Sequence, residues 1–187
     1  MQPRKPIAID LDGVVVDLVS VMLPKLSELA GRTVTAEDIK VFEIGQALGL
    51  TRATMAELWD WLEREQAYAH APPIEGAVQA LHNLGRERVS FMTSRPKSVR
   101  DQTLEWLRDH GLGEYQLEMG LPAHKVVRAG DFFALVEDNA THLASVASRV
   151  QLVLLYDQPW NRAAPTLPNM VRVQGWAEIL RLLNRGH

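Results

Sequence analysis

Two aspartates stand where an apolar run stops, in the stretch PIAIDLDGVVVD. In an extended chain, the side chains of Asp10 and Asp12 share one face, and Gly13 allows a sharp turn directly after them. Glu137 and Asp138 end a second apolar run. Carboxylates gathered this closely repel one another unless a cation lies among them. An all-oxygen group that leaves room for water and phosphate suits a hard ion, so we expect all four acids to hold Mg²⁺.

Residues that could bind an anion lie near the ends of other apolar stretches of the sequence. Thr93 and Ser94 offer hydroxyl and backbone donors near a predicted helix start, and Lys125 supplies a positive charge. Together with Gly13 they form the predicted phosphate-binding set. Arg128, one turn beyond Lys125, is the rival cation.

A phosphate held between these groups and the metal would face Asp10 and Asp12. Asp10 can attack as a nucleophile and form an aspartyl phosphate. Asp12 can give a proton to the leaving alcohol and later take one from water. The pattern therefore predicts phosphoryl-transfer chemistry, in which the metal and the lysine neutralise charge.

These residues need a scaffold that brings strand ends together. Strands are expected at 6–10, 88–94, 134–138 and 150–157, with a weaker edge candidate at 170–173, and helices at 75–87, 96–112, 141–149 and 175–185. Gly111 is placed to end the second of these helices. Strands alternating with helices predict an α/β fold with a doubly wound parallel sheet, whose ligands bind at the carboxyl ends of the strands.

One stretch breaks this alternation. Residues 18–71 carry about three helical patterns and no convincing strand, and the stretch ends at Pro72-Pro73. We expect a catalytic core made of 1–17 and 72–187, with 18–71 as a helical insert reaching over the end of the first strand.

Composition excludes several classes of protein. The 187 residues include 47% hydrophobic and 23% charged residues and carry a net charge of −3, which gives no basic field for polymeric nucleic acid. The absence of cysteine excludes disulfides and thiolate metal sites. The apolar stretch after MQPRK is too short for a signal peptide or a membrane span. We expect a cytoplasmic protein, monomeric or homodimeric, without a membrane partner.

Four segments, DLDGVVVD, MTSRP, HKVVRAGD and VEDN, resemble in order and position the four motifs of the haloacid-dehalogenase-like hydrolase superfamily. The resemblance implies a Rossmann-like core and a magnesium-dependent phosphatase. In that scheme Asp10 is the nucleophile, Asp12 the acid/base and Asp138 a metal ligand, with Thr93 or Ser94 and Lys125 on phosphate. It also implies that the insert 18–71 is a substrate-selecting cap.

A narrower resemblance, to the 5'(3')-deoxyribonucleotidase branch, rests on Asp17, KVVRAGDFFALVED and YDQPWNR. It implies a nucleoside monophosphate as the small phosphorylated substrate. The chain departs from the animal enzymes of that branch in having TSR in place of TSP and VED in place of IDD. Asp17 is equally suited to cap a helix.

The insert carries aromatic residues that suit a nucleobase. On a helical wheel Trp59 falls on an apolar stripe that predicts burial, whereas Trp61 lies at its edge. Trp61 and Phe42 are therefore candidate substrate contacts, with ordinary packing as the alternative. Arg95, after the second predicted strand, is a further candidate.

Other functions compete with a nucleotidase. A phosphatase or phosphomutase acting on a sugar phosphate would use the same residues. A receiver-type signalling domain also gathers acids around Mg²⁺, but this chain places Asp10 and Asp12 on its first strand and has a large insert. The preferred interpretation is a phosphomonoesterase acting on a nucleotide.

Overall fold

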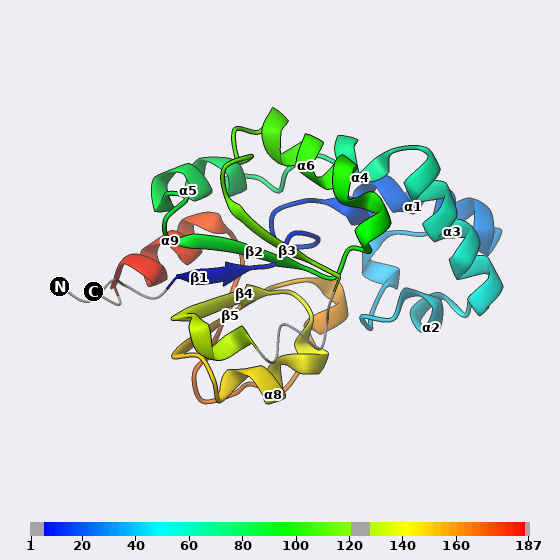
Figure 1. Cartoon of the computed structure of the whole chain (residues 1–187). Coiled ribbons are helices and arrows are strands. Elements are labelled where there is room, and N and C mark those ends of the chain that lie inside the picture. Colours follow the sequence, from blue (N-terminus) through cyan, green and yellow to red (C-terminus); the bar gives the residue numbers. More distant parts are fainter. Residues whose placement is uncertain (1–5, 121–127, 186–187) are drawn as a thin grey trace.

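The computed structural model of the protein describes residues 6–120 and 128–185 (Figure 1). Its centre is a sheet of six strands in the order β3-β2-β1-β4-β5-β6, in which every neighbouring pair is parallel. The strands are β1 Ile7–Ile9, β2 Val89–Thr93, β3 Gln116–Met119, β4 Ala134–Glu137, β5 Leu152–Tyr156 and β6 Met170–Val173. The predicted doubly wound α/β fold is confirmed.

Alternation along each strand builds one apolar layer on either side of the sheet. On β1, Ile7 and Ile9 face one side and Ala8 faces the other, because successive side chains of a strand point in opposite directions. The first side packs against α5 Ala77–Leu84, α6 Arg100–Asp109 and α9 Trp176–Arg185. The second packs against α8 Leu143–Ala147, which follows η4 Ala140–His142. Both faces are therefore buried, as the uninterrupted apolar runs predict.

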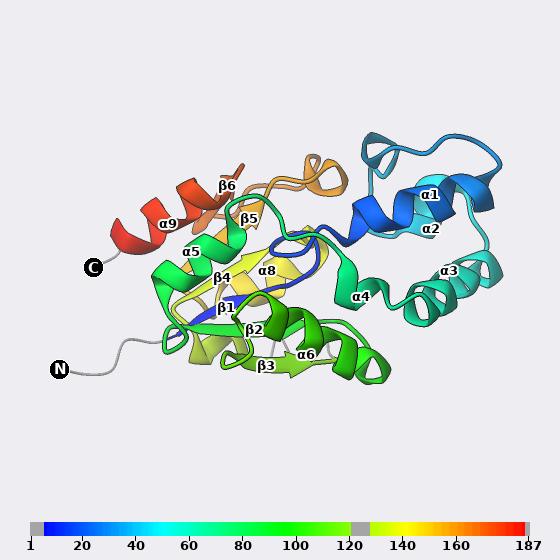
Figure 2. The same cartoon turned by 90° about the horizontal axis from the view of Figure 1, so that it is seen from above.

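The chain between β1 and α5 is helical and lies beyond the carboxyl ends of the strands (Figures 1 and 2). Its elements are α1 Leu18–Ala30, η1 Ala36–Asp38, α2 Ile44–Leu48, α3 Arg52–Arg64 and α4 Ala67–His70. Asp17 is the N-cap of α1, since its carboxylate accepts a hydrogen bond from the Ser20 backbone N–H at 3.0 Å. Gly31 ends α1 in a left-handed conformation with φ of 64°.

The structure adds one strand to those predicted from the sequence and divides one of the predicted helices. Strand β3 was not predicted, because QLEM lies at the sheet edge, where only Met119 is fully buried and the apolar pattern is weak. The predicted helix 96–112 begins as η2 Lys97–Val99 and continues as α6, which ends just before Gly111 (φ 70°). The weak candidate at 170–173 is confirmed as edge strand β6.

No helix within the described residues is long and apolar enough to cross a membrane. The longest of the helices around the sheet, α6 and α9, have 10 residues each, while about 20 apolar residues are needed for a bilayer.

Trp106 joins α6 to the segment that returns from the helical insert. Its side chain is fully buried, and its indole N–H donates to the Ala71 carbonyl at 2.7 Å. We expect Trp106→Phe to lower the free energy of unfolding by about 2 kcal/mol, because the buried carbonyl loses its donor. Urea denaturation measures the change. Trp59→Phe, at an exposed position, serves as the control, and equal stability of the two variants would contradict this role for Trp106.

Candidate active site

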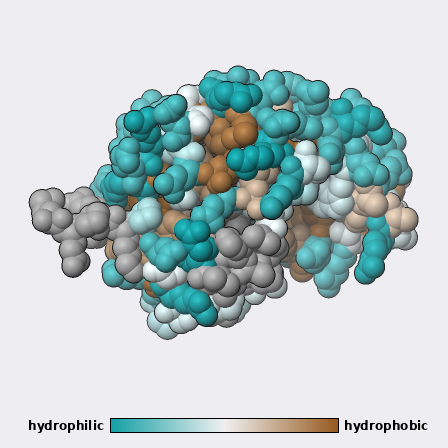
Figure 3. Space-filling view, in the orientation of Figure 1, coloured by the Kyte–Doolittle hydropathy of each residue, from teal (hydrophilic) through white to brown (hydrophobic). Residues whose placement is uncertain are grey.

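A cavity of about 850 Å³ lies between the carboxyl ends of the strands and the helices that follow β1. Hydrophobic residues are visible in the hollow between these two parts of the molecule (Figure 3). Strand-end residues form its floor, and apolar side chains of the insert form much of its wall. The residues from the strand ends and the turns after them include Asp10, Asp12, Gly13, Thr93, Ser94, Arg95, Glu137, Asp138 and Asn139.

Three buried carboxylates meet on the cavity floor. One oxygen from each of Asp10, Glu137 and Asp138 lies within 4.8 Å of the others. Neighbouring parallel strands explain this meeting, because Ile9 pairs with Val136 and the Asp10 backbone N–H donates to the Val136 carbonyl. Backbone N–H groups of the following turns donate to two of the carboxylates, Leu11 to Asp10 and Asn139 to Glu137. This group can hold a divalent cation, since all three ligands are oxygen.

Gly13 is required at its position for two reasons. Its φ of 77° belongs to the left-handed region that side chains disfavour, and a Cβ atom there would lie 2.1 Å from Oδ2 of Asp138. The turn after β1 can therefore approach the Asp138 carboxylate only with glycine at residue 13.

Asp12 does not join this acidic group through its side chain, in contrast to the prediction. Its carboxylate forms a bidentate ion pair with Arg95, at 2.7 Å from Nη2 and 2.9 Å from Nε. Asp12 and Asp10 are separated by one residue, but the chain turns directly after β1 rather than continuing as a strand, so their side chains diverge.

Arg95 is held in place by several contacts with the protein. Its guanidinium is almost fully buried, donates to the Thr103 hydroxyl at 3.1 Å, and lies 4.9 Å over the ring of Tyr68. The contact that the structure shows for its side chain is with Asp12, and a contact of Arg95 with substrate stays a prediction. Burial first, and then the charge of Asp12, raise the pKa of Tyr68 to about 12, so the phenol stays protonated at neutral pH.

The structure describes only some of the predicted phosphate-binding residues. Thr93 is buried, and its hydroxyl accepts a hydrogen bond from the Arg95 backbone N–H at 3.2 Å. Ser94 is exposed on the cavity wall. Lys125 lies outside the described residues. Its rival Arg128 forms ion pairs with Asp131 at 2.7 Å and Glu118 at 2.9 Å.

The burial of the two tryptophans of α3 is the reverse of what the helical wheel predicts. Trp59 is 43% exposed and lines the cavity, whereas Trp61 is half-buried and packs against the hydrophobic core. Phe42 is 40% exposed and lines the cavity, as expected of a substrate contact. The helix turns toward the core through Leu58 and Leu62, both fully buried, and this rotation exposes Trp59.

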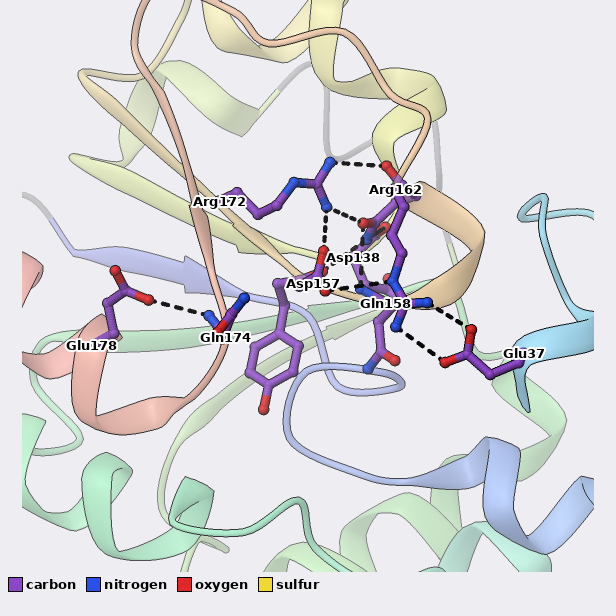
Figure 4. Close-up of polar contacts among 10 residues, drawn as sticks. Glu37, Asp138, Asp157, Gln158, Arg162, Arg172, Gln174 and Glu178 are labelled. Carbon is purple, nitrogen blue, oxygen red and sulfur yellow. Dashed lines mark hydrogen bonds and ion pairs between the residues drawn. The ribbon is translucent and has the colours of Figure 1, made fainter. Parts of the chain in front are cut away.

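The segment that follows β5 also forms part of the site. The sequence prediction did not include it. Its 3-10 helix η5 Pro159–Asn161 lies beside Asp138, and Arg162 binds Glu37 of the insert through two hydrogen bonds of 2.6 and 3.1 Å (Figure 4). The sequence signal was YDQPWNR, which was used for a family resemblance. Its position at the carboxyl end of a parallel strand was sufficient to place it near the ligand.

Comparisons with known proteins show the family of the chain. Residues 4–186 match the family model described as "5' nucleotidase, deoxy (Pyrimidine), cytosolic type C protein". The chain is 28% identical over 184 residues to the protein named "Putative nucleotidase BH1399" from Halalkalibacterium halodurans, covering 95% of this chain and 92% of the relative.

Solved structures share the fold. A haloacid-dehalogenase-family hydrolase from Deinococcus radiodurans, with bound phosphate and sodium, aligns over 100% of this chain and 98% of its own, at TM-score 0.63 and 16% identity. A haloacid-dehalogenase-like protein from Agrobacterium tumefaciens aligns over 98% and 99%, at TM-score 0.69 and 13% identity. Since the family model spans nearly the whole chain, the protein belongs to the family of deoxy (pyrimidine), cytosolic type C 5' nucleotidases.

Proposed function

We propose that the protein is a magnesium-dependent phosphomonoesterase that hydrolyses a nucleoside 5'- or 3'-monophosphate through an aspartyl phosphate. The observation that carries the proposal is the position of Asp10, which belongs to the buried acidic group and also faces the 850 Å³ cavity. In this proposal residues 1–17 and 72–187 form the catalytic core. The helical insert 18–71 is a cap over it.

Asp10, Glu137 and Asp138 are the residues that would hold Mg²⁺. Their fit is supported by geometry and ligand type, since one carboxylate oxygen of each residue lies within 4.8 Å of the others and Mg²⁺ prefers oxygen ligands. A bound Mg²⁺ supplies neutralisation of the charge on the phosphoryl oxygens.

The chain's own residues account for the bond changes. The Asp10 carboxylate forms a bond to phosphorus while the ester P–O bond breaks, and Asp12 gives a proton to the departing alcohol oxygen. Asp12 then takes a proton from water, whose oxygen attacks phosphorus and releases phosphate and the free Asp10 carboxylate. Arg95 fixes the orientation of Asp12 through two hydrogen bonds.

Phosphate binding is assigned to Thr93, Ser94, Lys125 and the backbone at Gly13. Ser94 lines the cavity and is exposed, so its hydroxyl is accessible to a ligand. The apolar wall contributed by the insert suits a nucleobase better than a bare sugar phosphate, because a ring can bury apolar area there.

Phosphate release from a panel of esters tests the substrate class. Nucleoside monophosphates should be hydrolysed with the highest kcat/KM, and EDTA should abolish the activity until excess Mg²⁺ is added. Fast turnover of sugar phosphates with none of any nucleotide would reject the proposed substrate. Activity that survives complete metal removal would reject the proposed cofactor.

Replacement of Asp10 by Asn tests the nucleophile. Because the amide is nearly the same size but a far weaker nucleophile, kcat should fall by about 10³-fold or more while the fold is kept. Circular dichroism and thermal unfolding check the fold. Asp60→Asn, at another acid that lines the cavity, is the matched control and should keep most of the activity. A D10N enzyme with near-normal kcat would overturn the assignment.

The two tryptophans of α3 give a matched pair for the nucleobase. Trp59→Leu should raise KM for nucleoside monophosphates by about 10-fold, since stacking of one base on an aromatic ring is lost. Trp61→Leu, on the same helix but outside the cavity lining, should affect stability and leave KM nearly unchanged. If steady-state kinetics instead showed a raised KM for Trp61→Leu and an unchanged KM for Trp59→Leu, the base contact would be assigned to Trp61.

A further inference from the structure

Three side chains that follow β5 bind the loops that carry the catalytic acids. Gln158 Nε2 donates to the Gly13 carbonyl at 2.8 Å, and Asn161 Nδ2 donates to the Asp138 carbonyl at 2.8 Å. Trp160 Nε1 donates to the carboxylate itself, at 3.0 Å from Oδ2 of Asp138. One short segment therefore fixes both the turn after β1 and the turn after β4.

Asn161 makes this segment rigid because every hydrogen-bonding position of its buried amide is used. Besides Asp138, Nδ2 donates to the Tyr156 carbonyl at 2.7 Å. Its Oδ1 accepts from Arg172 Nη1 at 2.6 Å and from the Gln158 backbone N–H at 3.3 Å. An amide with both donors and both acceptor positions engaged has a fixed orientation, so the residue beside it is held as well.

The indole of Trp160 meets the Asp138 carboxylate from the same side as the close turn at Gly13. A ring carbon of Trp160 lies 3.2 Å from where a Gly13 Cβ would be, and Oδ2 of Asp138 lies 2.1 Å from that point. The indole has one donor and no acceptor. Its hydrogen bond therefore orients the carboxylate without competing for a donor.

We propose that Trp160 is a positioning residue that orients the Asp138 carboxylate for metal binding. The inference rests on the metal site in the proposed function, and it requires nothing about the identity of the substrate. Because hydrogen bonds to metal-binding carboxylates tune the affinity of the site, loss of the indole N–H should weaken the metal complex.

Metal binding without substrate provides the test. Mn²⁺ prefers similar oxygen ligands to Mg²⁺, and its free concentration is measured by electron paramagnetic resonance. Trp160→Phe keeps a ring but lacks the donor, and should bind Mn²⁺ about 10-fold more weakly than the parent protein. Trp106→Phe also loses an indole donor, to the distant Ala71 carbonyl, and should bind Mn²⁺ normally. If Trp160→Phe does not fold, 3-benzothienylalanine at residue 160 keeps the bicyclic shape and replaces N–H with sulfur.

Steady-state kinetics separate the possible roles. Positioning predicts that Trp160→Phe needs more Mg²⁺ for half-maximal activity, while KM for substrate at saturating Mg²⁺ stays within about twofold of the parent value. Unchanged Mn²⁺ affinity with a raised KM would overturn the inference and make Trp160 a substrate contact. Weakened Mn²⁺ binding in a protein that hydrolyses no nucleotide would support the inference and reject the proposed substrate. A parent protein that binds no Mn²⁺ would reject both.

Discussion

Electrostatic repulsion among Asp10, Glu137 and Asp138 is the constraint on which the site depends. Two adjacent parallel strands end at the same level and deliver these buried carboxylates to one point. Burial makes their mutual repulsion stronger than it would be in water, so the surrounding structure has to supply compensating positive charge or donors. The three carboxylates could hold a divalent cation, and they line the cavity.

The protein supplies donors to the acids from three separate parts of the chain. Backbone N–H groups of the turns after β1 and β4 serve Asp10 and Glu137, and the indole of Trp160 serves Asp138. The partner of Asp12 is of another kind, because its carboxylate pairs with the buried guanidinium of Arg95. The two aspartates of the opening motif therefore lie in different environments: Asp10 belongs to the buried acidic group, and Asp12 is paired with a buried arginine.

The sequence was sufficient for the sheet and for most of the cavity floor, because strand ends in a parallel sheet are fixed by topology. Prediction from the sequence failed for features that a local pattern does not determine, such as which way a side chain points or which distant residue it meets. Strand β3 was missed because QLEM lies at the sheet edge. The apolar stripe of α3 does face the core through Leu58 and Leu62, but Trp59 and Trp61 flank it on opposite sides, and a helical wheel does not tell which of them turns inward. The pairing of Asp12 with Arg95, 83 residues apart, depends on tertiary structure that spacing cannot report.

The ion pair between Arg162 and Glu37 joins the insert to the segment that holds Asp138. Both side chains are more than half exposed, at 52% and 67%, so dissolved ions reach them freely. Such a contact is worth at most about 1 kcal/mol and weakens as counterions screen it. The link between the insert and this segment should consequently weaken as ionic strength rises, while the hydrogen bonds of the buried Asn161 on the same segment are screened much less.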